Sequence, residues 1–216
     1  MKTRDKIVNA SLELFNEHGE RSITTNHIAS HLGISPGNLY YHFRNKEDII
    51  NSIFSLYEEH LESGSKPYTD VAIDIELLLS YFDAMFNLMW QFRFMYANLA
   101  DILSRDDSLK KRYLVAQKNV LIRSSTVLKQ LKDDGFLAVD DENIVELADT
   151  MKMIVSFWIS YQLTQSSDST ITKATLYKGL LRVLMMFKAY ATEESAATFN
   201  RMELHYKQMA QQESVA

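Results

Sequence analysis

The sequence predicts an all-α protein made of a small N-terminal head and a larger helical body. Only six glycines and two prolines interrupt its 216 residues, and most of them lie where predicted helices begin or end. The long stretches between them carry apolar side chains three and four residues apart, as helices do when they bury one face. With 46% hydrophobic residues, the chain can enclose a substantial core. We expect a head of residues 1–48 and a body of residues 49–216.

Residues 24–46 predict two short helices joined by a tight turn. Thr24, or the threonine after it, can cap the first helix, because its hydroxyl accepts from unpaired N–H groups of the first turn. Gly33 can end this helix, since glycine adopts the left-handed conformation without a Cβ clash. Ser35 can cap the second helix, and Pro36 fits its first position, where no backbone N–H is needed. This outline is typical of a helix-turn-helix motif.

Further helices are predicted on both sides of the motif. One runs from about Thr3 to His18 and supports it, and Gly19 ends that helix. A fourth helix, from Lys46 to Glu62, has Asn45 as its cap and an apolar stripe that we expect to be buried.

The second helix of the motif carries groups suited to DNA rather than to solubility. Leu39 and Phe43 occupy its inward side, which leaves aromatic, amide and imidazole groups on the rest of so short a helix. From Arg21 through Arg44 to Lys46 there is no acidic residue, although the whole chain has a formal charge of −5. One local cationic region is therefore predicted. The alternative is that the tyrosines of this helix belong to an ordinary core.

The motif resembles the DNA-binding head of the TetR family of bacterial regulators. That pattern runs from a threonine through Ile-Ala and a glycine-containing turn to Leu-Tyr-x-[HY]-Phe-x-x-Lys. The sequence matches it at Thr24, Ile28, Ala29, Gly33, Leu39, Tyr40, His42, Phe43 and Lys46. The resemblance implies a ligand-responsive transcriptional regulator, a repressor that binds a palindromic double-stranded DNA operator. The implied DNA contacts are Thr24, Thr25, Asn26, Ser35, Pro36, Gly37, Asn38, Tyr40, Tyr41, His42 and Lys46.

Within this set the residue types suggest different roles. The amide of Asn38 is suited to a base edge, and the hydroxyl of Tyr40 to a phosphate. Lys46 stands at a predicted helix start, where its ammonium and the backbone N–H groups can hold one phosphate.

Beyond a break at residues 63–67, the composition shifts to methionine and large aromatic residues. Helices are predicted at about 71–91, 92–103, 107–134, 140–164, 172–190 and 193–212, with a polar loop at 166–170. No internal repeat is visible.

Methionine and aromatic side chains are large and adaptable, and they are suited to lining a cavity. Core packing is the alternative for each of them, and the resemblance favours a pocket for a small hydrophobic or aromatic inducer. The candidate ligand-binding residues are Phe82, Phe86, Trp90, Met95, Tyr96, Phe157 and Trp158. The charged residues nearby in sequence are Asp83, Arg93, Asp101 and Lys152, so the ligand should be largely uncharged or carry one charge.

A homodimer is expected, because one head covers one half-site and successive major grooves on one face lie about 34–36 Å apart. The resemblance implies that two long helices, 143–164 and 172–190, form the dimer interface. The candidates are Phe157, Trp158, Tyr161, Leu176, Leu180, Val183, Leu184 and Phe187. Intramolecular core is the alternative for each.

The sequence argues against other classes of protein. It has no cysteine, its six histidines are scattered, and its acidic pairs stand at predicted helix ends, so we expect no cofactor, no metal and no enzymatic activity. No apolar run is long enough for a membrane span, and no signal-peptide core is present, which indicates a cytoplasmic protein. The remaining alternative is a helical small-molecule-binding or scaffold protein whose head docks a protein partner.

Overall fold

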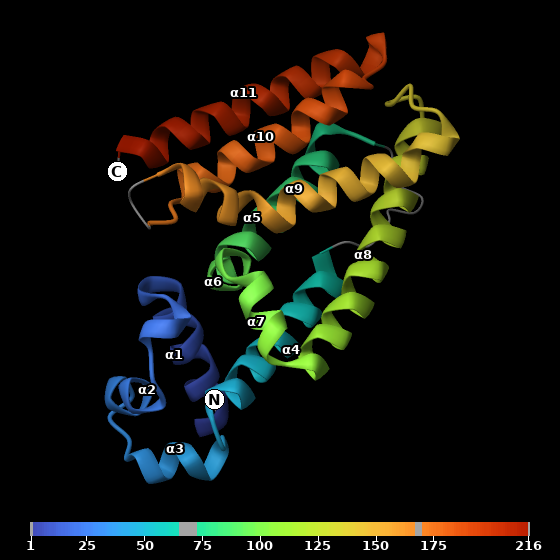
Figure 1. Ribbon diagram of the computed structural model, residues 1–216. Coiled ribbons are helices and arrows are strands. Elements are labelled where there is room, and N and C mark those ends of the chain that lie inside the picture. The colour runs from blue at the N-terminus through green and yellow to red at the C-terminus, as the bar shows by residue number, and fades with distance from the viewer. Residues whose placement is uncertain (1, 65–72, 167–169, 216) are drawn as a thin grey trace.

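The computed structural model describes residues 2–64, 73–166 and 170–215, and no β-strand occurs among them (Figure 1). The helices are α1 (Thr3–His18), α2 (Thr25–His31), α3 (Pro36–His42), α4 (Lys46–Gly64), α5 (Ile75–Gln91), α6 (Arg93–Ala97), α7 (Leu99–Arg105), α8 (Asp107–Asp133), α9 (Ile144–Gln165), α10 (Lys173–Ala189) and α11 (Glu193–Val215). Two short 3-10 helices, η1 (Glu20–Ser22) and η2 (Asp141–Asn143), complete the order. The predicted all-α class is confirmed.

The three N-terminal helices form a small head at one end of the molecule (Figure 1). Its core comes from each of them, with Ile7 and Phe15 of α1, Ile28 of α2 and Leu39 of α3 almost completely buried. Gly19 ends α1 with a φ of 79°, a left-handed conformation that glycine adopts without strain. The head is therefore a folded support for α2 and α3.

Helix α4 connects the head to the body. It packs against α1 on one side and against α5 and α8 on the other. Its predicted apolar stripe is buried, including Ile49, Ile53, Phe54 and Tyr57. Because α4 runs unbroken through residue 48, the domain boundary placed there stays a prediction.

The body consists of α5–α11, with α8 lying along α4 and with α9, α10 and α11 layered above (Figure 1). Helix α10 packs against α9, α11 and α5. Its apolar residues are consequently buried on several sides, and Leu176, Leu180, Val183 and Leu184 have no exposed surface.

The predicted helix at 92–103 is in fact two helices, because the chain leaves helical geometry at Phe92 and at Asn98. A distant residue supports the first break. Asn16 of α1 donates from Nδ2 to the carbonyl of Gln91 at 2.8 Å and accepts from the N–H of Phe94 at 3.0 Å. It thus satisfies backbone groups that the junction of α5 and α6 leaves unpaired. Helix α5 begins at Ile75 with Asp74 as its cap, and the predicted start at residues 71–72 lies outside the described residues.

One glycine stands inside a helix rather than at its end. Gly179 of α10 faces the indole of Trp158 on α9, and a Cβ at this position would lie 2.6 Å from the indole Cδ1. The indole N–H donates to the carbonyl of Thr175 at 2.7 Å. A glycine is therefore needed for the close approach of α9 to α10.

Candidate DNA-contacting surface and ligand pocket

The two helices of the motif are fixed by local hydrogen bonds. The hydroxyl of Thr24 accepts from the N–H of His27 at 3.3 Å, and Nδ1 of His27 accepts from the N–H of Thr24 at the same distance. This is a reciprocal capping box in which histidine takes the place of the usual acid or amide. Gly33 forms the turn with a φ of 63°. Ser35 accepts from the N–H of Asn38 at 3.1 Å, and Pro36 follows it in the first helical position.

The predicted DNA-contacting residues lie together on the outer face of α2 and α3. Leu39 and Phe43 point into the core, as predicted. On the other side Asn38 is exposed, Tyr41 is 84% exposed and Tyr40 is 49% exposed. The exposed members of the set also include Thr24, Asn26, Ser35, Pro36 and Gly37, while Thr25 and His42 are half-buried. A bond of 3.0 Å joins the hydroxyls of Tyr40 and Thr25 and ties α3 to the start of α2.

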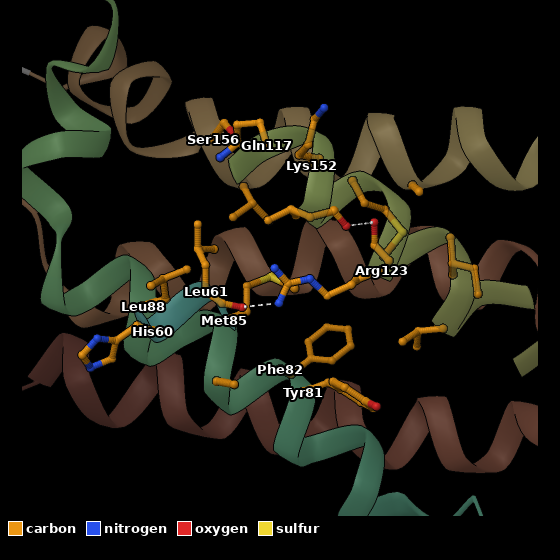
Figure 2. A pocket seen from close by; sticks show the side chains of 18 of the residues that line it. His60, Leu61, Tyr81, Phe82, Met85, Leu88, Gln117, Arg123, Lys152 and Ser156 are labelled. Carbon is orange, nitrogen blue, oxygen red and sulfur yellow. Dashed lines mark hydrogen bonds between the residues drawn. The ribbon is translucent and has the colours of Figure 1, made fainter. Parts of the chain in front are cut away.

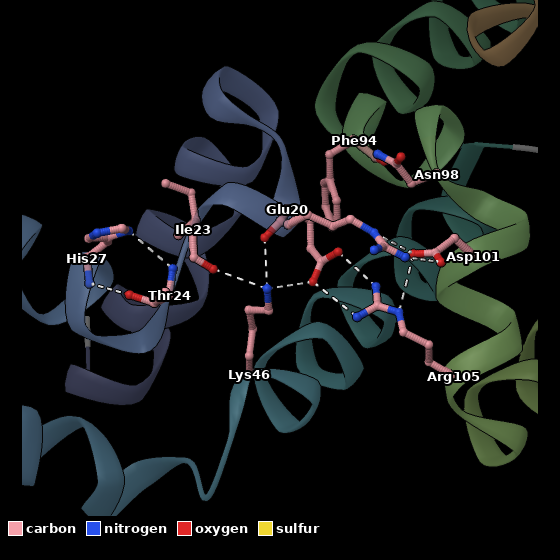
Figure 3. A network of polar contacts seen from close by, with 10 residues as sticks. Glu20, Ile23, Thr24, His27, Lys46, Phe94, Asn98, Asp101 and Arg105 are labelled. Carbon is pink, nitrogen blue, oxygen red and sulfur yellow. Dashed lines mark hydrogen bonds and ion pairs between the residues drawn. The ribbon is translucent and has the colours of Figure 1, made fainter.

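Lys46 is placed differently from the rest of the set (Figure 3). Its ammonium donates to the carbonyls of Glu20 and Ile23 at 2.9 and 3.2 Å, and it forms an ion pair with the Glu20 carboxylate at 2.9 Å. An ammonium has three hydrogens, so these oxygens satisfy all of them. A phosphate would have to displace one, and this geometry argues against the predicted phosphate contact. Lys46 instead attaches the segment after α1 to the start of α4.

Glu20 joins the head to the body. Its side chain has no exposed surface and pairs with both Lys46 and Arg105, the latter at 2.8 Å (Figure 3). Burial alone would raise the pKa of Glu20, but the hydrogen bonds and charges of Lys46 and Arg105 outweigh it, so the pKa lies below its ordinary value. Arg21 pairs with Asp101 of α7 beside it. No local sequence pattern indicates this network, because its members are far apart along the chain.

The body contains a cavity of about 190 Å³ between α4, α5, α6, α8, α9 and α10 (Figure 2). Most of its surface is apolar. Lining residues are Tyr57, His60, Leu61, Tyr81, Phe82, Ala84, Met85, Leu88, Tyr96, Gln117, Val120, Arg123, Ser124, Val127, Leu128, Ala148, Met151, Lys152, Val155, Ser156 and Phe187. Two of the predicted ligand-binding residues, Phe82 and Tyr96, are among them.

The other five predicted ligand-binding residues do not line this cavity. Phe86 stacks on Tyr177 with ring centroids 4.3 Å apart, and Met95 is buried in the core. The guanidinium of Arg93 covers the ring of Trp90 at 4.1 Å. Phe157 is 49% exposed on the outside of α9, and Trp158 packs on Gly179. Helical spacing identified apolar side chains but could not tell cavity, core and surface apart.

The cavity lining includes a small group of hydrogen-bonding side chains. The hydroxyls of Tyr57 and Tyr96 are 3.3 Å apart, and Gln117 donates to Tyr57 at 3.5 Å. Burial raises the pKa of both tyrosines well above the ordinary value, so both stay neutral. They offer hydrogen bonds rather than charge.

Of the charged residues considered from sequence, only Lys152 lines the cavity. Asp83 accepts a hydrogen bond from Tyr206 at 2.9 Å, and Asp101 pairs with Arg21. Arg123 of α8 also lines the cavity, although no sequence pattern singled it out. The helices that surround Arg123 could be identified only from the fold, so its position in the sequence did not indicate a cavity.

Most of the predicted dimer residues belong to the interior of the chain. Leu176, Leu180, Val183 and Leu184 are fully buried, Phe187 is 7% exposed, and Trp158 is half-buried. The intramolecular alternative holds for these, because α10 is covered by three other helices. Phe157 and Tyr161 of α9 are exposed, and they share a face with Met153.

Comparison with known proteins agrees with this architecture. The family described as "Bacterial regulatory proteins, tetR family" matches residues 7–53, and the one described as "Bacterial transcriptional repressor" matches residues 56–199. A TetR-family regulator from Marinobacter aquaeolei VT8 superposes with a TM-score of 0.86 at 35% identity, over 95% of this chain and 99% of that one. The chain belongs to the TetR family.

Other members are more distant. The HTH-type transcriptional regulator QacR of Staphylococcus aureus is 25% identical over 173 residues, which are 73% of this chain and 86% of QacR. The structure titled SmeT-Triclosan complex shares the fold, with a TM-score of 0.56 at 20% identity over 88% of this chain and 92% of that one. As a TetR-family member, the chain is a DNA-binding transcriptional regulator, and the predicted family is confirmed. None of the helices in the described ranges is long and apolar enough to cross a membrane.

Proposed function

We propose that this TetR-family regulator is a homodimeric repressor, and that a small, mainly apolar ligand in the cavity releases it from a palindromic operator. One observation carries this proposal. Helix α4 lines the cavity with Tyr57, His60 and Leu61, and its other end holds the head through Lys46. A ligand that moves α4 therefore acts on the position of α2 and α3. The description of the family matched over residues 56–199 favours repression.

The operator is read by the exposed face of α3. Asn38 and Tyr41 are exposed on α3, and α3 lies at the end of the head that is far from α9, α10 and α11 (Figure 1). Thr24, Thr25 and Asn26, at the start of α2, hold the phosphate backbone, together with Tyr40. The exposed and half-buried residues of the predicted set, without Lys46, make up this proposed interface.

The dimer forms through the exposed apolar face of α9. Met153, Phe157 and Tyr161 are spaced four residues apart and are each about half exposed. Residues four apart lie on one side of a helix. The body must place two heads on one operator. An exposed apolar stripe on α9 supports a two-fold contact between two copies of the body.

Ligand binding reaches the head by two routes. Along α4, a displacement at the cavity end of the helix reaches its first turn, where Lys46 holds the head. Through α7, Arg105 and Asp101 hold Glu20 and Arg21 of the head. A ligand that prefers the displaced arrangement by about 1–3 kcal/mol lowers operator affinity by roughly 5–150-fold. The triclosan in the SmeT structure is consistent with an aromatic, apolar ligand in such a body.

The test begins with selection of bound sequences from random DNA, using the full-length protein. The selected site should be palindromic, and retardation of it should weaken with salt. Candidate ligands are then tested by calorimetry and by operator affinity in parallel. Tryptophan emission is a poor reporter here, because neither Trp90 nor Trp158 lines the cavity. Ligands that bind tightly without changing operator affinity would refute induced release.

A further inference from the structure

We infer that the cavity selects an apolar molecule carrying one anionic group, a carboxylate, which binds Arg123. This inference rests on the proposed function, since it names the chemical class of the ligand for the same cavity. The expectation from sequence was a ligand that is largely uncharged or carries one charge. The inference specifies the sign of that charge, and it assigns a role to a residue that helical spacing did not single out.

The position of Arg123 supports the inference. It is half-buried on α8, and its side chain reaches into the cavity toward Leu61 and Met85 (Figure 2). Its Nη1 donates to the carbonyls of Leu61 and Glu62 at 3.1 and 3.4 Å. A guanidinium has five N–H donors, and those on Nε and Nη2 have no partner among the described residues. Donors with the planar geometry that a carboxylate prefers are thus available at the cavity.

The charges around the cavity all have the same sign. The charged residues that line it are Arg123 and Lys152, and no aspartate or glutamate lines it within the described parts of the chain. Lys152 pairs with the exposed Asp149 at 2.7 Å, and its ammonium points away from the cavity (Figure 2). A cationic ligand would be buried beside Arg123 without a counter-charge, which is costly, whereas an anionic one would be paired.

The remaining lining defines the rest of the molecule. Phe82, Met85, Leu88, Val127 and Met151 present apolar surface. The volume of about 190 Å³ is smaller than the roughly 300–1,000 Å³ of drug-sized pockets. A short alkyl or aryl chain ending in a carboxylate fits this description.

The same contact links the ligand to the head. The carbonyls of Leu61 and Glu62 belong to the last turn of α4, and Arg123 is their hydrogen-bond donor. A carboxylate forms a stronger hydrogen bond with a guanidinium than a neutral carbonyl does. A carboxylate bound to Nε and Nη2 that draws the guanidinium toward itself therefore pulls on the end of α4, the helix that positions the head.

The test compares three probes of equal chain length, octanoate, octanol and octyltrimethylammonium, by calorimetry on the full-length protein. Wild type should bind octanoate at least about tenfold more tightly than octanol, and the ammonium most weakly. Arg123→Gln should lose the preference for octanoate and keep its affinity for octanol. Arg123→Lys keeps the charge and should retain part of the preference. Lys129→Gln is the matched control, because Lys129 lies on the same helix, outside the cavity, paired with Asp133.

Equal affinity for octanoate and octanol, a preference for the ammonium, or no binding of any probe would each overturn the inference. So would an undiminished preference in Arg123→Gln. Operator affinity, measured in the same samples, tests the proposed function separately. If octanoate is preferred through Arg123 but leaves operator affinity unchanged, the ligand class stands and induced release fails.

Discussion

A buried carboxylate at the junction of head and body is the clearest polar feature at the scale of single residues. Glu20 pairs with Lys46 and Arg105 and has no exposed surface. Glu20→Gln removes the charge that both cations share. The free energy of unfolding should fall by about 1–3 kcal/mol, because Lys46 and Arg105 lose their charged partner. Urea unfolding measures this change. Glu17→Gln, at a residue with an exposed side chain, should leave stability nearly unchanged.

The pH dependence of stability follows from the pKa of Glu20, which is lower in the folded state than its ordinary value of 4.5. The contribution of the charged carboxylate is fully present above that ordinary value and is lost as the pH falls toward the lower folded-state pKa. Between about pH 5 and pH 3, wild type should therefore lose more stability than Glu20→Gln. Parallel curves for the two proteins would contradict the role assigned to Glu20.

Base recognition by α3 depends on single exposed side chains. Asn38 is exposed on α3, and only its backbone N–H is used in the Ser35 cap. Asn38→Ala should keep the fold but change which bases are preferred, with about 1–3 kcal/mol for each lost contact. Competition among operator variants measures this preference. Ser30→Ala, an exposed residue of α2 outside the proposed contacts, is the control. An unaltered ranking of sites in Asn38→Ala would exclude Asn38 from base reading.

At the scale of elements, local signals predicted the motif well. The caps at Thr24 and Ser35 and the turn at Gly33 depend on residues within one or two turns of the chain, so the sequence contains the information needed. The break between α5 and α6 depends on Asn16, far away in sequence. No local pattern could reveal it.

The site shows the same division. Phe82 and Tyr96, two of the predicted ligand-binding residues, line the cavity, yet Phe86 has the same character as Phe82 and packs on Tyr177 instead. Arg123 could not be predicted, because its role comes from the ends of other helices around it. Residue type and spacing give the buried face of a helix, while the neighbours of that face decide between core and cavity.

The close contact of α9 with α10 leaves no room for a side chain at residue 179. Gly179→Ala would favour the helical backbone by about 1 kcal/mol on propensity alone. The added Cβ would lie 2.6 Å from the Trp158 ring, and overpacking of this kind costs about 1–3 kcal/mol. We expect a net loss in thermal stability. Combining it with Trp158→Leu should make the two effects non-additive. A stabilised Gly179→Ala protein would mean that the helices are not in this close contact.

For the whole molecule, the exposed face of α9 determines the expected assembly. Phe157→Glu places a charge in the middle of the apolar stripe that includes Met153 and Tyr161. Burying an unpaired charge between two copies is strongly unfavourable, so this variant should be monomeric. Sedimentation at micromolar concentration gives the mass. Leu204→Glu, at a residue of α11 that is 58% exposed, is the matched control and should remain dimeric. The reverse result would move the interface to α11.

Coupling between cavity and head is a property of the whole chain, and α7 provides its test. Arg105 contacts Glu20 of the head and Asp101 of its own helix, and it does not line the cavity. Arg105→Gln should therefore leave ligand affinity of the DNA-free protein unchanged and reduce the factor by which ligand weakens operator binding. Linkage requires the same reduction in the factor by which operator weakens ligand binding, so both are measured, by calorimetry and by operator retardation. Lys110→Gln, an exposed residue at the start of α8, should keep both factors at the wild-type value. If Arg105→Gln also keeps them, the signal travels through α4 alone, because the two helices are the proposed links between the cavity and the head.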